Sequence, residues 1–279
     1  MKNLVFTSAG QREFRDKDNK PLVNNNPINE WTKGLKDFDL VTYCYDDSDI
    51  GKDKSNLWIR RPGFTKYQNF NHYASFYPKH LEQYDYVWVV DDDMFMSTDD
   101  INKMFQMMED YNLDLAQPSI SLDGMNYVQI FAHDSRYTLR YTNYVECCAM
   151  LLSKRGLEKV KRTFSETVTG WGWDALVSDM ILEKENVAVL DSVQAYHGMS
   201  MSSINKVLPR ELHRVEGKNL LEKYDKLNVL ERREVLSGIE LNGKHLDITF
   251  YKPEAETQYI VKVNLGDKIT WKPTLIQRK

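Results

Sequence analysis

The stretch Tyr86-Val-Trp-Val-Val-Asp-Asp-Asp-Met-Phe95 decides the fold. Its apolar run, Val87 to Val90, does not alternate with polar residues, which is typical of a buried strand in the centre of a parallel sheet. Three carboxylates follow at once, and ligands of open α/β sheets bind beyond the carboxyl ends of such strands. We therefore expect Asp91, Asp92 and Asp93 to lie at the mouth of a binding site.

The three carboxylates indicate a cation site, because adjacent negative charges repel one another unless a cation binds between them. Hard, oxygen-preferring ions such as Mg²⁺ or Mn²⁺ fit such ligands best, and they keep coordination positions for phosphate oxygens. The alternative is an acidic turn on a solvated edge of the sheet. The strand before the turn is too apolar for an edge strand, which favours the metal site.

Composition limits the classes of protein to consider. The chain has 279 residues, with 42% hydrophobic and 12% aromatic residues, enough for a sizeable core. The net charge of −4 and the pI near 5.9 provide no basic field for nucleic acid, so no nucleic-acid partner is expected. The cysteines, Cys44, Cys147 and Cys148, show no metal-site spacing and no even disulfide framework, which favours a reducing compartment.

The location expected from these features is the cytoplasm. The chain enters a strand at Leu4 without a signal peptide, and no apolar run approaches the ~20 residues of a membrane-spanning helix. The cationic stretch Arg210 to Lys226 could bring the protein to the inner face of a membrane as a peripheral contact. Acidic residues within this stretch favour a solvated helix face instead.

Strands and helices alternate from residue 1 to about 198, which predicts an α/β fold with a mostly parallel sheet flanked by helices. From residue 200 the pattern changes to a charged helical stretch followed by short strands. We expect a catalytic domain over residues 1–200. Residues 201–279 are expected to form a small C-terminal helical and β appendage.

Two further strands are predicted to end beside the acidic one. The first ends at Ser8-Ala-Gly10, a small-residue turn that permits close approach by a nucleotide, although it is neither a dinucleotide fingerprint nor a P-loop. The second, Leu40 to Tyr45, ends at Asp46, which either holds a ribose or terminates the strand. Lys66, near the start of the following helix, could contact phosphate or be an ordinary exposed lysine.

A second acidic group lies later in the chain. Glu146 interrupts the apolar run Tyr141 to Leu152, and we expect it inside a buried strand. A buried carboxylate is costly unless it is paired, which makes Glu146 a functional candidate. The alternative is a structural salt bridge with Arg136 or Arg140.

The loop Gly170-Trp-Gly-Trp-Asp174 combines glycines, which allow close approach to a ligand, with flat rings on which a sugar can stack. Trp171 and Trp173 are therefore candidate binding residues. Asp174 is either a helix N-cap or a general base for an acceptor hydroxyl. His197, after the last strand of this region, is either structural or a further metal ligand.

Taken together, these motifs resemble the GT-A glycosyltransferases. Asp91-Asp-Asp93 looks like their DxD motif, Gly170-Trp-Gly-Trp-Asp174 is similar to their Trp-Gly-plus-acid segment, and His197 lies where many of them carry a late metal-binding histidine. With Gln117-Pro-Ser119 and Tyr144-Val-Glu146, the set more closely resembles an uncharacterised GT-A-like family found in plants and bacteria. The resemblance covers about residues 1–200.

The resemblance implies a GT-A-like fold and a metal-dependent, hexosyltransferase-like enzyme. It would move a sugar from a nucleotide-diphosphate sugar, a UDP-sugar being favoured, to the hydroxyl of a cell-surface glycan or another acceptor. In this scheme Asp91, Asp93 and His197 hold Mn²⁺ or Mg²⁺, and Asp174, or Glu146 instead, activates the acceptor. The donor-binding residues would be Ser8, Asp46, Lys66, Asp91, Asp92, Trp171 and Trp173.

Three other functions are compatible with parts of the pattern. A phosphohydrolase of the haloacid-dehalogenase type also places DxD after a buried strand, but it needs a small hydroxyl where this chain has Phe95. A nucleotidyltransferase usually opens with a Gly-rich basic loop, of which Ser8-Ala-Gly-Gln-Arg12 is a thin version. A non-catalytic carbohydrate-binding protein is disfavoured by the intact triple aspartate, Glu146 and Asp174.

Overall fold

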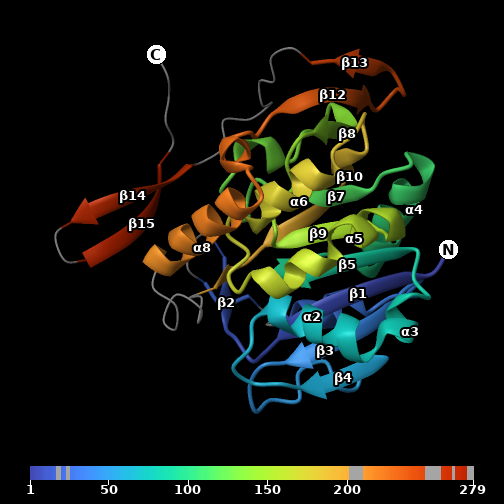
Figure 1. Ribbon diagram of the computed structural model, residues 1–279, viewed down its shortest axis with the longest axis vertical. Helices are drawn as coiled ribbons and strands as arrows, with labels where there is room; N and C mark the ends of the chain where they lie inside the picture. Colours follow the sequence, from blue (N-terminus) through green and yellow to red (C-terminus); the bar gives the residue numbers. More distant parts are fainter. Residues whose placement is uncertain (17–19, 23–25, 201–209, 249–258, 266–267, 275–279) are drawn as a thin grey trace.

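The computed structural model describes residues 1–16, 20–22, 26–200, 210–248, 259–265 and 268–274. Strands and helices alternate through most of the chain, and helices flank a large central sheet (Figure 1). The α/β class predicted from the sequence is therefore confirmed. The strands are β1 Asn3–Ala9, β2 Phe14–Arg15, β3 Asp39–Cys44, β4 Leu57–Arg60, β5 Tyr86–Asp91, β6 Met94–Phe95, β7 Leu115–Ile120, β8 Tyr137–Thr142, β9 Ala149–Ser153, β10 Val187–His197, β11 Met199–Ser200, β12 Val235–Glu240, β13 His245–Asp247, β14 Tyr259–Leu265 and β15 Lys268–Thr274. The helices are α1 Pro27–Trp31, α2 Lys66–Phe76, α3 Pro78–Leu81, α4 Thr98–Asp110, α5 Lys154–Val160, α6 Trp173–Ile181 and α8 Arg210–Lys223, with 3₁₀ turns η1 Gln129–Phe131, η2 Lys161–Glu166 and η3 Leu227–Val229.

The strand that carries the aspartates, β5, lies in the middle of the main sheet, whose order is β13-β12-β8-β10-β7-β9-β5-β1-β3-β4. It pairs in parallel with β1 and antiparallel with β9. The antiparallel β9 makes the sheet mixed, while β7 and β10 again run in the direction of β5. The carboxyl ends of β4, β3, β1, β5, β7 and β10 therefore share one edge of the sheet.

Helices cover both faces of the sheet, as the register between β1 and β5 shows. Val5 pairs with Trp88 on one face, and the next residue, Phe6, points to the other. Trp88 packs on Trp31 of α1 with ring centroids 5.6 Å apart, whereas Phe6 meets Phe70 of α2 at 5.0 Å. These rings are fully buried, so each face of β5 and β1 is sealed and only the strand ends meet solvent.

The chain after residue 200 adds to this framework. Strand β12 pairs antiparallel with β8 and, together with β13, extends the main sheet at that edge. Helix α8 packs on α6 (Figure 1), and β14 and β15 pair with each other in a separate two-stranded sheet. Residues 201–209 lie outside the described residues, so the domain boundary expected at residue 200 stays a prediction. No helix in the described ranges has both the length and the apolarity that a membrane crossing requires.

Candidate functional site

The acidic turn lies where the sequence predicts it. Asp91 is the last residue of β5, and Asp92 and Asp93 form the turn into the short strand β6. Strand β6 pairs antiparallel with the end of β10, where Met94 lies opposite His197. This pairing brings His197 Nε2 to 3.5 Å from Asp93 Oδ1, joining two residues that are far apart in the sequence.

Two cations from other elements approach the aspartates. Lys66, the first residue of α2, places Nζ 2.7 Å from Asp91 Oδ1. Arg12, from the loop after β1, lies 2.9 Å from Asp92 Oδ1 and 3.6 Å from Asp93 Oδ2. With His197 at Asp93, every carboxylate of the triplet therefore faces a positively charged or protonatable group.

Lys66 is buried, so the interpretation of an ordinary exposed lysine is wrong. Its Nζ also donates a hydrogen bond of 2.7 Å to the Cys147 carbonyl. Burial alone would lower the pKa of Lys66, but the charge of Asp91 outweighs it and raises this pKa. Lys66 is thus a fixed cation at the carboxyl edge of β5.

His197 and Asp93 likewise stabilise each other's charged forms. Burial alone would lower the pKa of His197, but Asp93 raises it to about 9. Burial would raise the pKa of Asp93, but His197 lowers it below its ordinary value. The other ring nitrogen, Nδ1, lies 3.1 Å from the Met125 carbonyl, which holds the ring so that Nε2 faces Asp93. A ring oriented by a carbonyl in this way is typical of a histidine that binds metal.

The side chain of Asp92 is hydrogen-bonded to the loop that follows β1 and to the residue that follows β3. Its Oδ2 accepts hydrogen bonds from the Gly10 amide at 3.1 Å and the Tyr45 hydroxyl at 2.7 Å. Burial raises the pKa of Asp92 to about 6, although Arg12 opposes the rise. A Cβ on Gly10 would lie 2.1 Å from the Tyr45 ring, so only glycine fits this turn. Asp92 therefore fixes the loop after β1, and a direct contact with a donor stays a prediction.

The other two nucleotide-side candidates lie at the same edge. Ser8 is buried in β1, where its hydroxyl accepts a hydrogen bond of 2.9 Å from Asn69. Asp46 accepts hydrogen bonds from the amides of Gln11 at 2.7 Å and Ser48 at 2.9 Å. Burial would raise the pKa of Asp46, but the hydrogen bonds from Ser48 lower it. Asp46 thus terminates β3 as one sequence interpretation expects, and its contact with a ribose stays a prediction.

Asp174 is buried near the start of α6 and does not cap the helix, since the N-cap is Gly172. Its Oδ2 accepts the Tyr144 hydroxyl at 2.7 Å, and its Oδ1 accepts the Ala175 amide at 2.9 Å. Burial raises the pKa of Asp174, although the hydrogen bond from Tyr144 opposes the rise. The side chain is thus held in one orientation by neighbouring groups of the protein.

The expected position of Glu146 inside a strand is wrong. Strand β8 ends at Thr142 and β9 begins at Ala149, so Glu146 lies in the loop between them. In this loop the Glu146 amide donates a hydrogen bond of 2.7 Å to Gln117 Oε1 of β7. The side chain is partly exposed, and burial raises the pKa of Glu146 to about 7 although His197 opposes the rise.

The salt bridge suggested as an alternative for Glu146 does not form. Arg140 pairs with Asp191 at 2.7 Å in the core, and Arg136 pairs with Asp134 at 2.6 Å. Glu146 instead interacts electrostatically with His197 and Asp174. The triple aspartate, Glu146, the Asp174 loop and His197 are therefore brought together in one site.

The two tryptophans of the Gly170–Asp174 loop differ in their surroundings. Trp171 is 43% exposed, which leaves a ring face open to a ligand. Trp173 is 1% exposed and donates its indole N–H to Thr163 at 2.8 Å, while its ring packs 4.6 Å from that of Phe164. A sugar cannot stack on Trp173 in this packing, so the expected stacking role falls to Trp171 alone.

Three residues of the site carry no clear signal in the sequence. Arg12 lies in a thin basic loop, and Tyr45 reads as an ordinary strand residue. The guanidinium carbon of Arg233 lies 5.0 Å from the centre of the Tyr144 ring, and its charge opposes the rise that burial causes in the pKa of Glu146 and of Asp174. Nothing local to Arg233 signals this role, because the contact depends on the pairing of β12 with β8.

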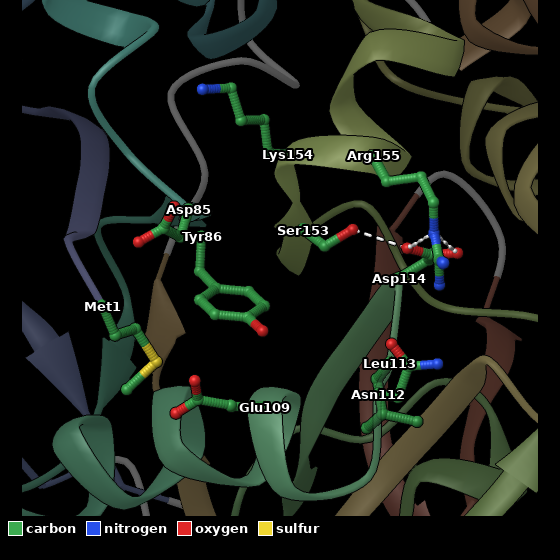
Figure 2. Close-up of a pocket in the computed structure, with 10 residues that line it drawn as sticks. All are labelled: Met1, Asp85, Tyr86, Glu109, Asn112, Leu113, Asp114, Ser153, Lys154 and Arg155. Carbon is green, nitrogen blue, oxygen red and sulfur yellow. Dashed lines mark hydrogen bonds and ion pairs between the residues drawn. The ribbon is translucent and has the colours of Figure 1, made fainter.

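A hollow of about 420 Å³ lies at the opposite edge of the sheet, where β5 begins and β9 ends (Figure 2). One of its acidic residues, Asp114, is already paired, since it accepts hydrogen bonds from Arg155 at 2.7 Å and Ser153 at 2.6 Å. None of the carboxylates of the acidic turn reaches it. The chemistry of the chain is concentrated at the other edge, which we take as the candidate site.

Comparisons with known proteins give structural similarity only. No protein-family model and no curated protein matches the chain. The crystal structure of S. aureus TarS 1–349 matches with a TM-score of 0.49 and 14% identity over 82% of this chain and 69% of that chain, and TarS 1–349 in complex with UDP-GlcNAc has the same TM-score. A197 from STIV matches with a TM-score of 0.42 and 13% identity, covering 91% of this chain and 98% of that chain.

A mannosyltransferase, PcManGT from Pyrobaculum calidifontis in complex with GDP-Man and Mn²⁺, matches with a TM-score of 0.43 and 11% identity, covering 79% of this chain and 64% of that chain. TM-scores below 0.5 at such identities carry no argument about function. The function proposed below therefore depends on the residues of this chain, and the resemblance to a plant and bacterial family stays a prediction.

The charge balance at Asp92 predicts a pH-dependent loss of stability on removal of Arg12. We expect Arg12→Met to lower the free energy of unfolding by about 3 kcal/mol at pH 8 and by much less at pH 5. The pKa of Asp92 is already raised to about 6, and it rises further without the guanidinium. At pH 5 the carboxyl is protonated in both proteins, whereas at pH 8 the variant must bury an unpaired carboxylate or bind a proton.

Urea unfolding of both proteins at the two pH values measures this difference. Arg60→Met is the matched control, because Arg60 pairs at 2.8 Å with the exposed Asp49 and should cost about 1 kcal/mol or less at either pH. An equal loss at pH 5 and pH 8 for Arg12→Met would contradict the coupling of Arg12 to Asp92.

Proposed function

We propose that this protein is a metal-dependent glycosyltransferase that moves a sugar from a nucleotide-diphosphate sugar to an acceptor hydroxyl. The observation that carries the proposal is the placement of Asp91, Asp92 and Asp93 at the carboxyl end of a buried central strand, with Lys66 and Arg12 against them. A site with both carboxylates and fixed cations suits a diphosphate bound together with a divalent ion. The resemblance to GT-A enzymes supports the same function.

The residues present fit a divalent ion. Asp93 and His197, with the partly exposed Asp91, would hold Mn²⁺ or Mg²⁺. Within the described part of the chain no cluster of three or more acidic, histidine or cysteine ligands forms a site by itself. An ion held by so few protein ligands would take the rest from phosphate and water, as Mg²⁺ usually does. When bound, the ion would neutralise charge on the leaving nucleoside diphosphate.

Lys66 and Arg12 would bind the donor phosphates from the protein side. Both cations are fixed in the free protein, Lys66 by the Cys147 carbonyl and Arg12 by the Tyr45 hydroxyl. Fixed cations aimed at developing charge need little reorganisation during the reaction, which is the most effective form of electrostatic stabilisation. The guanidinium of Arg12 can in addition bind phosphate through two parallel hydrogen bonds.

On the acceptor side, Glu146 suits the role of general base better than Asp174, which the sequence favours. The pKa of Glu146, raised to about 7, is close to the optimum for a base at neutral pH, and its side chain is partly exposed. Both oxygens of Asp174 already accept hydrogen bonds in the buried helix start. We propose that Glu146 activates the acceptor if the reaction inverts configuration, and that Asp174 orients Tyr144 beside it.

The donor preference and the location are further parts of the proposal. A UDP-sugar donor and a glycan acceptor follow from the resemblance, as does a hexosyl group. A cytoplasmic location, with peripheral contact at the inner face of a membrane, is proposed from the sequence alone. The donor, the acceptor and the location are independent of the metal-diphosphate site, so an error in any of them would leave the proposed site unaffected.

Thermal unfolding in the presence of nucleotides tests the donor site. We expect one of UDP, GDP, CDP and ADP, with UDP favoured, to raise the melting temperature only when Mn²⁺ is present, by a few degrees at saturating ligand. Asp93→Asn should abolish this rise, whereas Asp99→Asn, at an exposed position in the first turn of α4, should leave it intact. No rise with any nucleotide would favour the phosphohydrolase or carbohydrate-binding functions instead.

Amide substitutions of Glu146 and Asp174 test which of the two carboxylates is the general base. With the donor identified by binding, Glu146→Gln should lower turnover by about 10²- to 10⁴-fold with little change in donor affinity, since it removes a general base. Asp174→Asn should cost less, because the amide oxygen can still accept the Tyr144 hydroxyl. Rates close to wild type for Glu146→Gln would exclude it as the base, and a larger loss for Asp174→Asn would assign the role to that residue.

A further inference from the structure

Glu216 of α8 holds the loop that leads into the candidate site. A single carboxylate oxygen, Oε1, accepts hydrogen bonds from the Thr167 hydroxyl at 2.6 Å and the Thr169 hydroxyl at 3.1 Å. The same oxygen accepts the amides of Val168 at 2.9 Å and Thr169 at 3.0 Å. Four donors from three consecutive residues thus converge on one side chain that is distant in sequence.

The two threonine hydroxyls extend the hydrogen-bond network to the next residues of the loop. Thr167 Oγ1 accepts the Gly170 amide at 2.9 Å, and Thr169 Oγ1 accepts the Trp171 amide at 3.2 Å. Each hydroxyl donates to Glu216 and accepts from an amide three or two residues ahead. The carboxylate therefore fixes the loop as far as Trp171, two residues before α6 begins at Trp173.

The same part of α8 lies in close contact with the loop. A Cβ on Gly217 would lie 2.5 Å from the Trp171 carbonyl oxygen, and one on Gly172 would lie 2.9 Å from Gly217 Cα. Gly172 has φ of +72°, a conformation that residues with a Cβ rarely adopt. The two glycines let α8 approach the loop backbone directly, so the position of the helix and that of the loop are coupled.

We infer that Glu216 is a positioning residue of the candidate site. It sets the loop 167–172, which presents Trp171 and leads into the first turn of α6, where Asp174 lies. The inference rests on the proposed function for what the site binds, but the geometry of the loop can be measured without it. Through Glu216, helix α8 organises the acceptor side of the proposed site. The donor side is built by β1, α2 and β5.

The negative charge of Glu216 is the feature on which this role depends. A carboxylate is an acceptor only, and hydrogen bonds from neutral donors to a charged oxygen are stronger than those between neutral groups. A glutamine at this position would present an amide group that donates and would lose the charge. Two of the four donors are threonine hydroxyls, which can rotate toward another acceptor. The other two are backbone amides, which cannot rotate, so a weaker acceptor would leave these amides less protected from exchange with solvent.

Hydrogen exchange of the protein tests the inference directly. In Glu216→Gln, the amides of residues 168–171 should exchange roughly tenfold faster or more than in wild type, while those of β5 are unchanged. Glu222→Gln is the matched control, because Glu222 is exposed on the same helix and its side chain pairs with Lys218 at 3.5 Å, on the helix surface. Unchanged exchange at residues 168–171 in Glu216→Gln would overturn the inference.

A second variant covers the case in which Glu216→Gln does not fold. Thr167→Val keeps the shape of the side chain but removes the hydroxyl between Glu216 and the Gly170 amide, and it should speed exchange at Gly170 more than at Trp171. Equal effects on both amides would contradict the two-branch arrangement.

The catalytic readout separates this inference from the proposed function. Glu216→Gln should raise the KM for the acceptor or lower kcat by roughly tenfold while the Mn²⁺-dependent binding of the nucleoside diphosphate stays at its wild-type strength. A proportional loss of nucleotide binding would show a general structural effect and overturn the positioning role. If wild type binds no nucleotide at all, the proposed function fails, whereas the exchange experiment still decides the role of Glu216 in the loop.

Discussion

Three carboxylates on consecutive residues can lie at the end of a buried strand only because cations from other elements neutralise them. Lys66 comes from the first turn of α2, Arg12 from the loop after β1, and His197 from the end of β10. The parallel direction of β1, β5 and β10 places all of these groups at one edge of the sheet. The charge pairing thus depends on the topology, and the conformation of the loop after β1 depends on the charge pairing.

This pairing also suggests how the free protein is prepared for a ligand. The cations that stabilise the aspartates are of the kind that bind phosphate, and the aspartates are of the kind that bind a divalent ion. A metal-bound diphosphate brings both charges at once, so it can replace the internal pairs without leaving any group uncompensated. Arg233 and Glu216, from the chain beyond residue 200, order the opposite side of the same site.

The sequence predicts the part of this site that depends on strand ends. A non-alternating apolar run followed by Asp91–Asp93 places the acidic turn, because both features are local. The strand expected around Glu146 is wrong, since this residue lies in a loop, where its amide bonds to Gln117, a side chain 29 residues away in the sequence. Trp173 looks like a ligand-facing ring but is buried against Phe164. The hydrogen bond of Glu216 with Thr167 joins residues 49 positions apart in the sequence. Such long-range packing is invisible to local patterns.

We propose that the carboxylates of the acidic turn form a metal site only together with a diphosphate. The decisive experiment is a titration of Mn²⁺ into the protein, followed by electron paramagnetic resonance with and without saturating UDP. We expect weak Mn²⁺ binding alone, because Lys66, Arg12 and protonated His197 compete for the carboxylates, and binding at least roughly tenfold tighter with the diphosphate. Equally tight binding in both conditions, or none in either, would contradict it.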